Sequence, residues 1–249
     1  MPRLWMFLAL GLTLALAQLR FSAAECTLRV SLNHPARIYL FKNDRPFRLH
    51  PVDAILPIKV DTFYRDTVWR RGTPARALEV TAHDQSHFIL LDGRADFSLP
   101  PGDYRLEVWR GLFFTPIRQS FTLKPGETRA LQLTLERWNP GSRLWLSGDD
   151  HIHLPRTIAD NEIFLKWMAA EDLSVGNFLQ LQRQVDAAPQ YAFGDAGEAR
   201  RPGFSIRSGQ ESRSEYYGHI NMLGGRQLIR PLSVGAMYAN EPAAAPWPA

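Results

Sequence analysis

Apolar and polar residues alternate with a period of two from residue 26 to residue 137. The alternation is clearest at 27–32 and 130–136, and the second of these segments has the pattern of a half-buried antiparallel strand. Shorter strands are predicted at 37–41, 77–82, 88–91, 103–109 and 119–123. Proline and glycine between them, as in Pro100-Pro101-Gly102 and Pro125-Gly126, supply turns. The segment therefore predicts an all-β sandwich of about a hundred residues.

The pattern changes at Asn139-Pro140-Gly141, a turn signal at which we place a domain boundary. A strand is predicted at 144–150, and a helix with Asp160 as its N-cap follows. The helix carries one apolar stripe at helical spacing, formed by Ile163, Phe164, Trp167 and Met168. The next strand is predicted at 173–179, a loop at 187–202, and short strands at 204–206 and 218–223. Strand, helix and strand in succession indicate a βαβ unit and a parallel sheet or barrel.

The N-terminal residues have the features of a secretory signal peptide. Arg3 precedes an apolar run at 4–16, and the small residues Ser22, Ala23 and Ala24 follow. The alternative is an uncleaved N-terminal anchor, although the run is shorter than the roughly 20 residues that a spanning helix needs. We expect cleavage after Ala24, export to the periplasm or the extracellular space, and no stable membrane span afterwards.

Composition removes several function classes. The chain has 29 Lys and Arg against 25 Asp and Glu, a net charge of +4. Its densest basic group, Arg65, Arg70 and Arg71, is too short for a basic stripe, so no nucleic-acid partner is expected. Cys26 is the only cysteine and lies beside the predicted cleavage site, and the chain has no Gly-x-Ser-x-Gly motif. Disulfides within the chain are excluded, and a serine or cysteine nucleophile is disfavoured.

The candidate chemistry begins with Asp149-Asp150-His151-Ile152-His153 at the end of a predicted strand. Two histidines spaced by two on a strand project from one face, and paired imidazoles suit zinc, iron or manganese. Asp149 or Asp150 could orient one ring through its second nitrogen. The alternative is a pair of loop histidines that face water.

Two further candidates lie downstream of this motif. Glu211 follows a short strand and a glycine, and His219 opens another strand. A carboxylate and an imidazole at strand ends can complete a metal site. The alternative is a surface acid and a hydrogen-bonded core histidine.

Four segments, taken in order, resemble one enzyme family. They are 145–153, 170–175, Gly209-Gln210-Glu211 and 218–224. The set is similar to the carbaryl-hydrolase-like (CehA/McbA) metallohydrolases of the polymerase-and-histidinol-phosphatase (PHP) superfamily, which are distorted (β/α)7 barrels. The resemblance implies that His151 and His153 bind one metal, that Glu211 bridges to a second, and that His219 binds that second metal. Residues 99–108 resemble a hairpin of carboxypeptidase-regulatory-like sandwich domains, which are accessory modules.

The chain also departs from the family pattern. Asp160 lies further from His153 than the family's aspartate, and 178–182 contains neither Asp nor His. The family's later ligands would fall after residue 249. We therefore expect a multidomain chain with a signal peptide at 1–24, an all-β accessory sandwich at 25–138, and the N-terminal part of an α/β PHP-like (β/α)7 barrel at 139–249.

The expected function is metal-dependent hydrolysis of a small-molecule phosphate, carboxylic or carbamic ester, weak in this form. An open barrel edge would need a second copy of the chain or a missing C-terminal half to cover it. The alternative is a non-catalytic exported binding module with a degenerate metal site. In that case Trp109, Phe113 and Phe114 would form an exposed aromatic patch, whereas their more common role is in a core.

Overall fold

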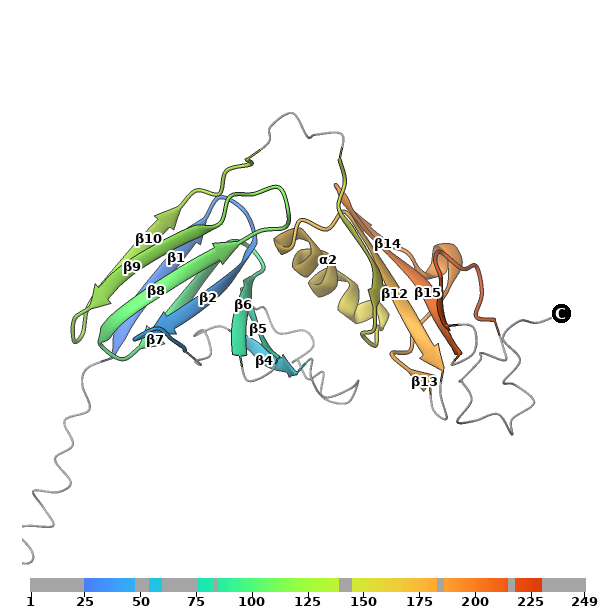
Figure 1. The fold of residues 1–249 in the computed structure, drawn as a ribbon, viewed down its shortest axis with the longest axis horizontal. Helices are drawn as coiled ribbons and strands as arrows, with labels where there is room; N and C mark the ends of the chain where they lie inside the picture. The colour runs from blue at the N-terminus through green and yellow to red at the C-terminus, as the bar shows by residue number, and fades with distance from the viewer. Residues whose placement is uncertain are drawn as a thin grey trace, which may run out of the picture.

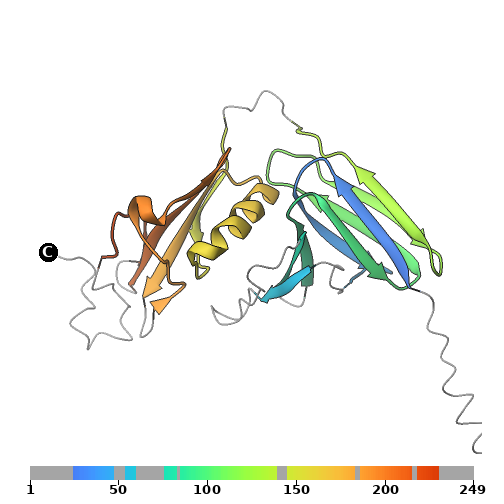
Figure 2. The ribbon, with the colours of Figure 1, turned by 180° about the vertical axis from the view of Figure 1, so that it is seen from behind.

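The structure is a computed structural model that describes residues 25–47, 54–59, 76–82, 85–138, 145–182, 186–214 and 218–229. A β-sandwich and a second sheet lie on either side of one α-helix, as Figures 1 and 2 show from opposite sides. The predicted signal peptide and the Asn139-Pro140-Gly141 boundary fall outside the described residues. In the part of the chain that the structure describes, no helix has the length and apolar character needed to cross a membrane.

The sandwich consists of a seven-stranded and a three-stranded sheet. The larger has the order β4-β5-β6-β2-β8-β9 with β3 on β2, and the smaller has the order β10-β1-β7. The strands are β1 Cys26–Leu32, β2 Ala36–Lys42, β3 Arg45–Pro46, β4 Ala54–Lys59, β5 Ala77–Ala82, β6 Gln85–Leu90, β7 Arg94–Leu99, β8 Gly102–Trp109, β9 Ile117–Leu123 and β10 Thr128–Leu133. Every strand predicted in this segment has a counterpart, whereas β3, β4 and β7 were not predicted.

The alternating residues build a core between these two sheets. Burial alternates along β1, and Phe88 meets Phe97 edge to face with ring centroids 5.3 Å apart. Phe114 is also buried, at 7% exposure, which favours the core role over an exposed aromatic patch. One expectation is wrong: the strand predicted at 130–136 pairs with β1 in parallel, not antiparallel. Alternation reports which face is buried and carries no information about strand direction.

The second sheet has the order β11-β12-β15-β14, with β13 on β12 and β16 on β15. Its elements are β11 Gly148–Ile152, the 3-10 turn η2 Ile158–Asp160, α2 Asn161–Ala170, β12 Val175–Gln182, β13 Asp186–Ala187, η3 Gly194–Gly197, β14 Ala199–Arg201, β15 Phe204–Ser214 and β16 Gly218–Met222. Strands β11, β12 and β15 are parallel, and β13, β14 and β16 run antiparallel to their neighbours. The predicted βαβ unit corresponds to β11, α2 and β12.

The prediction of part of a (β/α)7 barrel is wrong. A barrel of that kind places a helix after each strand. Among the described residues α2 is the one α-helix, and the connection from β12 to β15 consists of β13, η3 and β14. The family motifs lie at strand ends, so they carried no information about the connections between strands. Residues 187–202 lack an apolar stripe at helical spacing, and they form short strands and a 3-10 turn instead.

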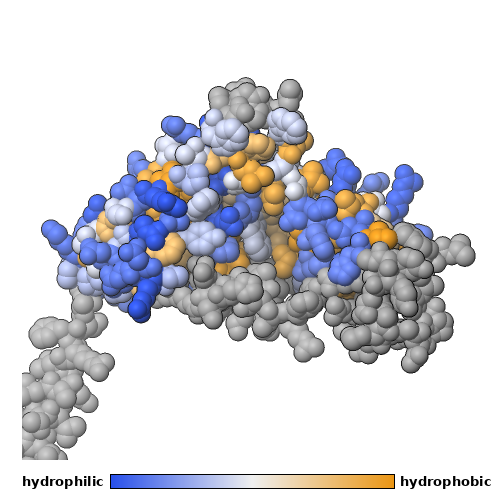
Figure 3. Space-filling model, in the orientation of Figure 1, coloured by the Kyte–Doolittle hydropathy of each residue, from blue (hydrophilic) through white to orange (hydrophobic). Residues whose placement is uncertain are grey.

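Helix α2 packs against both parts of the molecule. At its start Asp160 Oδ2 accepts a hydrogen bond from the backbone N–H of Thr157 (2.8 Å). Ile163 and Trp167 contact the core of the second sheet on one side. On the other they contact a cluster from β5, β6 and the residue after β6, formed by Leu78, Val80, Ile89 and Leu91. Figure 3 shows apolar surface between the sandwich and the second sheet on this face. The helix therefore joins the two parts through apolar contact.

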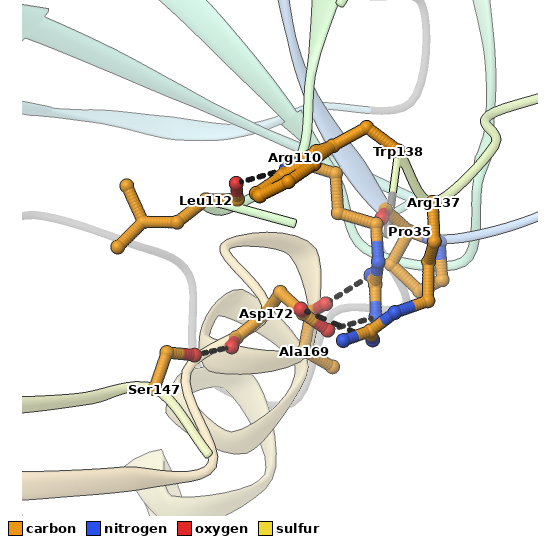
Figure 4. A network of polar contacts seen from close by, with 8 residues as sticks. All are labelled: Pro35, Arg110, Leu112, Arg137, Trp138, Ser147, Ala169 and Asp172. Atoms are coloured by element: carbon orange, nitrogen blue, oxygen red, sulfur yellow. Dashed lines mark hydrogen bonds and ion pairs between the residues drawn. The ribbon is translucent and has the colours of Figure 1, made fainter. Parts of the chain in front are cut away.

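A buried arginine fixes this junction (Figure 4). Arg110, 7% exposed, donates to the carbonyl oxygens of Pro35 and Ala169 and pairs with Asp172 Oδ1 at 3.0 Å. Arg137 lies 3.8 Å from Asp172 Oδ2, and the Ser147 hydroxyl donates to the Asp172 carbonyl oxygen. Asp172 therefore connects the end of α2 to the sandwich and to the segment that leads into β11.

Candidate metal centre

Strand β11 aims two imidazoles at one side of the second sheet. Its register against β12 shifts between Asp149 and Ile152, an irregularity of the kind that re-aims side chains. A Cβ on Gly176 of β12 would meet Met168 of α2 and Ile152, so these positions face the helix. His151 and His153 alternate with Ile152 and consequently lie on the face away from α2.

Glu211 joins them from β15. In the parallel register of β12 and β15, Leu181 pairs with Glu211 while Phe178 pairs with Ser208, so Glu211 lies on the same face as the histidines. Its side chain is 0% exposed. Its Oε2 lies 2.6 Å from His153 Nε2 and 3.2 Å from His151 Nε2. The two Nε2 atoms are 2.9 Å apart. Three side chains predicted from the sequence thus converge on one point.

His219 approaches the other oxygen of the same carboxylate. Its Nδ1 lies 2.9 Å from Glu211 Oε1, and its side chain is 56% exposed. It comes from β16, which pairs antiparallel with the end of β15. Glu211 therefore has one oxygen directed to His151 and His153 and the other directed to His219.

Backbone groups orient the two histidines of β11. His153 Nδ1 lies 2.9 Å from the carbonyl oxygen of Leu179, which can only accept, so Nδ1 carries the hydrogen and Nε2 presents its lone pair. The sequence had assigned this role to Asp149 or Asp150. The structure instead places Asp149 Oδ1 2.9 Å from the backbone nitrogen of His151, where it accepts a hydrogen bond, and leaves Asp150 exposed.

This donor set fits a divalent metal. Ligand atoms bound at about 2.0–2.2 Å in tetrahedral or octahedral geometry lie about 3 Å apart from one another. The Nε2 atoms of His151 and His153 and the Oε2 atom of Glu211 lie 2.6–3.2 Å from one another, and shifts of a few tenths of an ångström would bring them to that spacing. Two imidazoles and one carboxylate are also the ligand types that zinc, manganese and iron accept. These three residues can hold a metal ion.

A second buried arginine supports the sheet from the helix side. Arg156, 2% exposed, donates to Gln190 Oε1 (3.0 Å) and to Ser208 Oγ (2.7 Å), and Ser208 lies on β15 three residues before Glu211. It also donates to Asn161 Oδ1 and to the carbonyl oxygen of Gly197. Burial lowers the pKa of the Arg156 guanidinium. The sequence gave no signal for this network, because an arginine in a loop is usually solvated.

Comparison with protein-family models, with curated proteins and with solved structures found no match for this chain. The chemistry of the centre therefore rests on its own geometry.

Proposed function

We propose that this protein is a metal-dependent hydrolase of a small-molecule phosphate, carboxylic or carbamic ester, with zinc, manganese or iron held by His151, His153 and Glu211. The observation that carries the proposal is the convergence of two imidazoles and one fully buried carboxylate at a site with an open side. His151 is 41% exposed, whereas Glu211 is 0% exposed. Structural zinc sites use four protein ligands, while catalytic sites use three and leave a position open.

A divalent metal held by these residues would supply Lewis acidity and would activate water as a nucleophile near neutral pH. The protein residues supply the rest. Glu211 provides negative charge inside the sheet, the Leu179 carbonyl fixes the tautomer and angle of His153, and Asp149 fixes the backbone that carries His151. His219, on the exposed rim, shares the carboxylate and can bind a second metal beside it. The resemblance to CehA/McbA metallohydrolases supports this division of roles and the ester class.

A turnover assay on metal-loaded protein tests the proposal. Protein loaded with zinc, manganese or iron would be incubated with a generic phosphodiester and with an aryl carbamate. We expect weak turnover that depends on the metal and disappears in Glu211→Gln. The matched control is Glu198→Gln, the same chemical change at a residue that directly precedes β14 and pairs with Arg207 at 3.0 Å. It should retain turnover.

Two outcomes would contradict the proposal in different ways. Bound metal without turnover of either substrate would favour the alternative, a non-catalytic exported binding module with the same metal site. Turnover that persists in Glu211→Gln would show that the chemistry lies elsewhere in the chain.

A further inference from the structure

Asn221 is paired with Glu211 across two strands, and its side-chain oxygen Oδ1 has no hydrogen-bond partner among the described residues. The two residues are direct cross-strand partners in the antiparallel register of β15 and β16, so their side chains share one face and their Cβ atoms are about 5 Å apart. Among the described residues, no group donates a hydrogen bond to Asn221 Oδ1, although this atom is buried. Buried side-chain oxygens are nearly always satisfied, and an exception calls for an explanation such as a bound ion.

The neighbouring groups narrow the choice of partner. An amide oxygen and a carboxylate are both acceptors, so neither can satisfy the other. A cation placed beside them would satisfy Asn221 Oδ1 and be attracted to the carboxylate. His219 alternates with Asn221 on β16, and its Nδ1 already lies 2.9 Å from Glu211 Oε1, the oxygen turned away from His151 and His153. Glu211 Oε1 and His219 Nδ1 therefore lie together, and Asn221 shares their face of the sheet.

The close approach of β16 is built into the sequence. A Cβ on Gly209 would lie 2.6 Å from the carbonyl oxygen of Met222. Only glycine at this position lets the β16 backbone lie so near β15. Asn221, the residue before Met222, is thereby held in the register that places it opposite Glu211.

We infer that Asn221 Oδ1 is a ligand of a second cation, held together with Glu211 Oε1 and His219 Nδ1. This inference rests on the proposed function, because it extends the same centre. Two oxygen donors and a single nitrogen favour a hard cation such as Mn²⁺, whereas the pair of imidazoles at the first position suits zinc. Asn221 thus gives the two positions different metal preferences.

Titration calorimetry of the full chain with MnCl₂ tests the inference, with wild type, Asn221→Ala and Asn221→Asp compared. We expect wild type to bind two Mn²⁺ ions. Asn221→Ala should keep the first position and weaken the second by about tenfold or more, since even indirect supports of metal sites are worth that much. Asn221→Asp, which keeps an oxygen donor and adds charge, should bind the second ion at least as tightly as wild type.

Thermal unfolding of the metal-free proteins adds a readout that a structural role would move. Because no described group donates to Oδ1, the loss of this oxygen should not by itself lower the unfolding temperature of Asn221→Ala. A lower unfolding temperature would overturn the inference, as would equal affinity for the second Mn²⁺ in Asn221→Ala or a single Mn²⁺ in wild type. Absence of any metal binding in wild type would instead overturn the proposed function itself.

Discussion

Replacing Gly209 with alanine should displace β16 and lower stability by about 1–3 kcal/mol, the usual cost of overpacking. The added Cβ would lie 2.6 Å from the carbonyl oxygen of Met222 and 2.7 Å from Leu179 Cδ2, whereas ordinary contact begins at 3.4 Å. The Leu179 side chain can rotate away. The Met222 carbonyl belongs to the backbone, so β16 itself has to move by roughly 0.8 Å, the difference between 3.4 and 2.6 Å. His219 and Asn221 would move with it.

Thermal unfolding measures the first effect. A chain of this size loses about 2–4 °C per kcal/mol, so Gly209→Ala should unfold about 2–12 °C below wild type. The matched control is Gly225→Ala, since a Cβ there meets no atom closer than the Gln227 carbonyl oxygen at 3.5 Å. That variant should change stability by less than about 1 kcal/mol. If Gly209→Ala were as stable as Gly225→Ala, β16 would not pack against β15 as described.

Three further experiments test the buried ion pair, the buried histidine of the sandwich and the predicted signal peptide. Asp172→Ala removes the carboxylate that pairs with buried Arg110, and it should lower the free energy of unfolding by about 3–5 kcal/mol, measured by thermal unfolding. Arg29→Ala, which breaks an exposed pair with Asp96, should lower it by less than about 1 kcal/mol, and equal losses in the two variants would refute the stabilising role of the buried pair. Burial, with a smaller effect of Arg37, lowers the pKa of His87 to about 4 from 6.5, so the unfolded chain binds the proton first and stability should fall as pH drops from 6.5 to 4. Over this pH range the free energy of unfolding, measured with urea, should fall by up to about 3 kcal/mol, and the fall should be smaller in His87→Gln. N-terminal sequencing of exported protein should find Glu25 first, and a chain that still begins at Met1 in the membrane fraction would contradict signal cleavage.

The sequence located most strands because burial on one face leaves a two-residue period that is visible without a structure. It did not reveal the parallel pairing of β10 with β1, since direction depends on which strands become neighbours. The barrel expectation failed for a related reason. Motifs at strand ends indicated the parallel strands β11, β12 and β15 but gave no information about the segments that connect them. In the described part of the chain, the connection from β11 to β12 contains an α-helix and the connection from β12 to β15 does not.

For the candidate metal centre, the sequence predicted the ligand residues but not the contacts that orient them. His151, His153 and Glu211 were found from the sequence because side chains at the carboxyl ends of parallel strands gather at one edge. The contacts that orient them were not found. Strand register brings the Leu179 carbonyl to His153 and places Asn221 opposite Glu211, and register is set by packing between segments far apart in the chain.

Metal content is the most direct test of the central claim that His151, His153 and Glu211 form a metal centre. Elemental analysis would compare purified wild type with the double variant His151→Ala/His153→Ala, after equal loading and removal of unbound ions. His87→Gln, a histidine change within the sandwich, is the control. We expect stoichiometric divalent metal in wild type and in His87→Gln, and we expect the double variant to lose the ion that His151 and His153 hold, so that its metal content falls. Equal metal content in the double variant and wild type would contradict it.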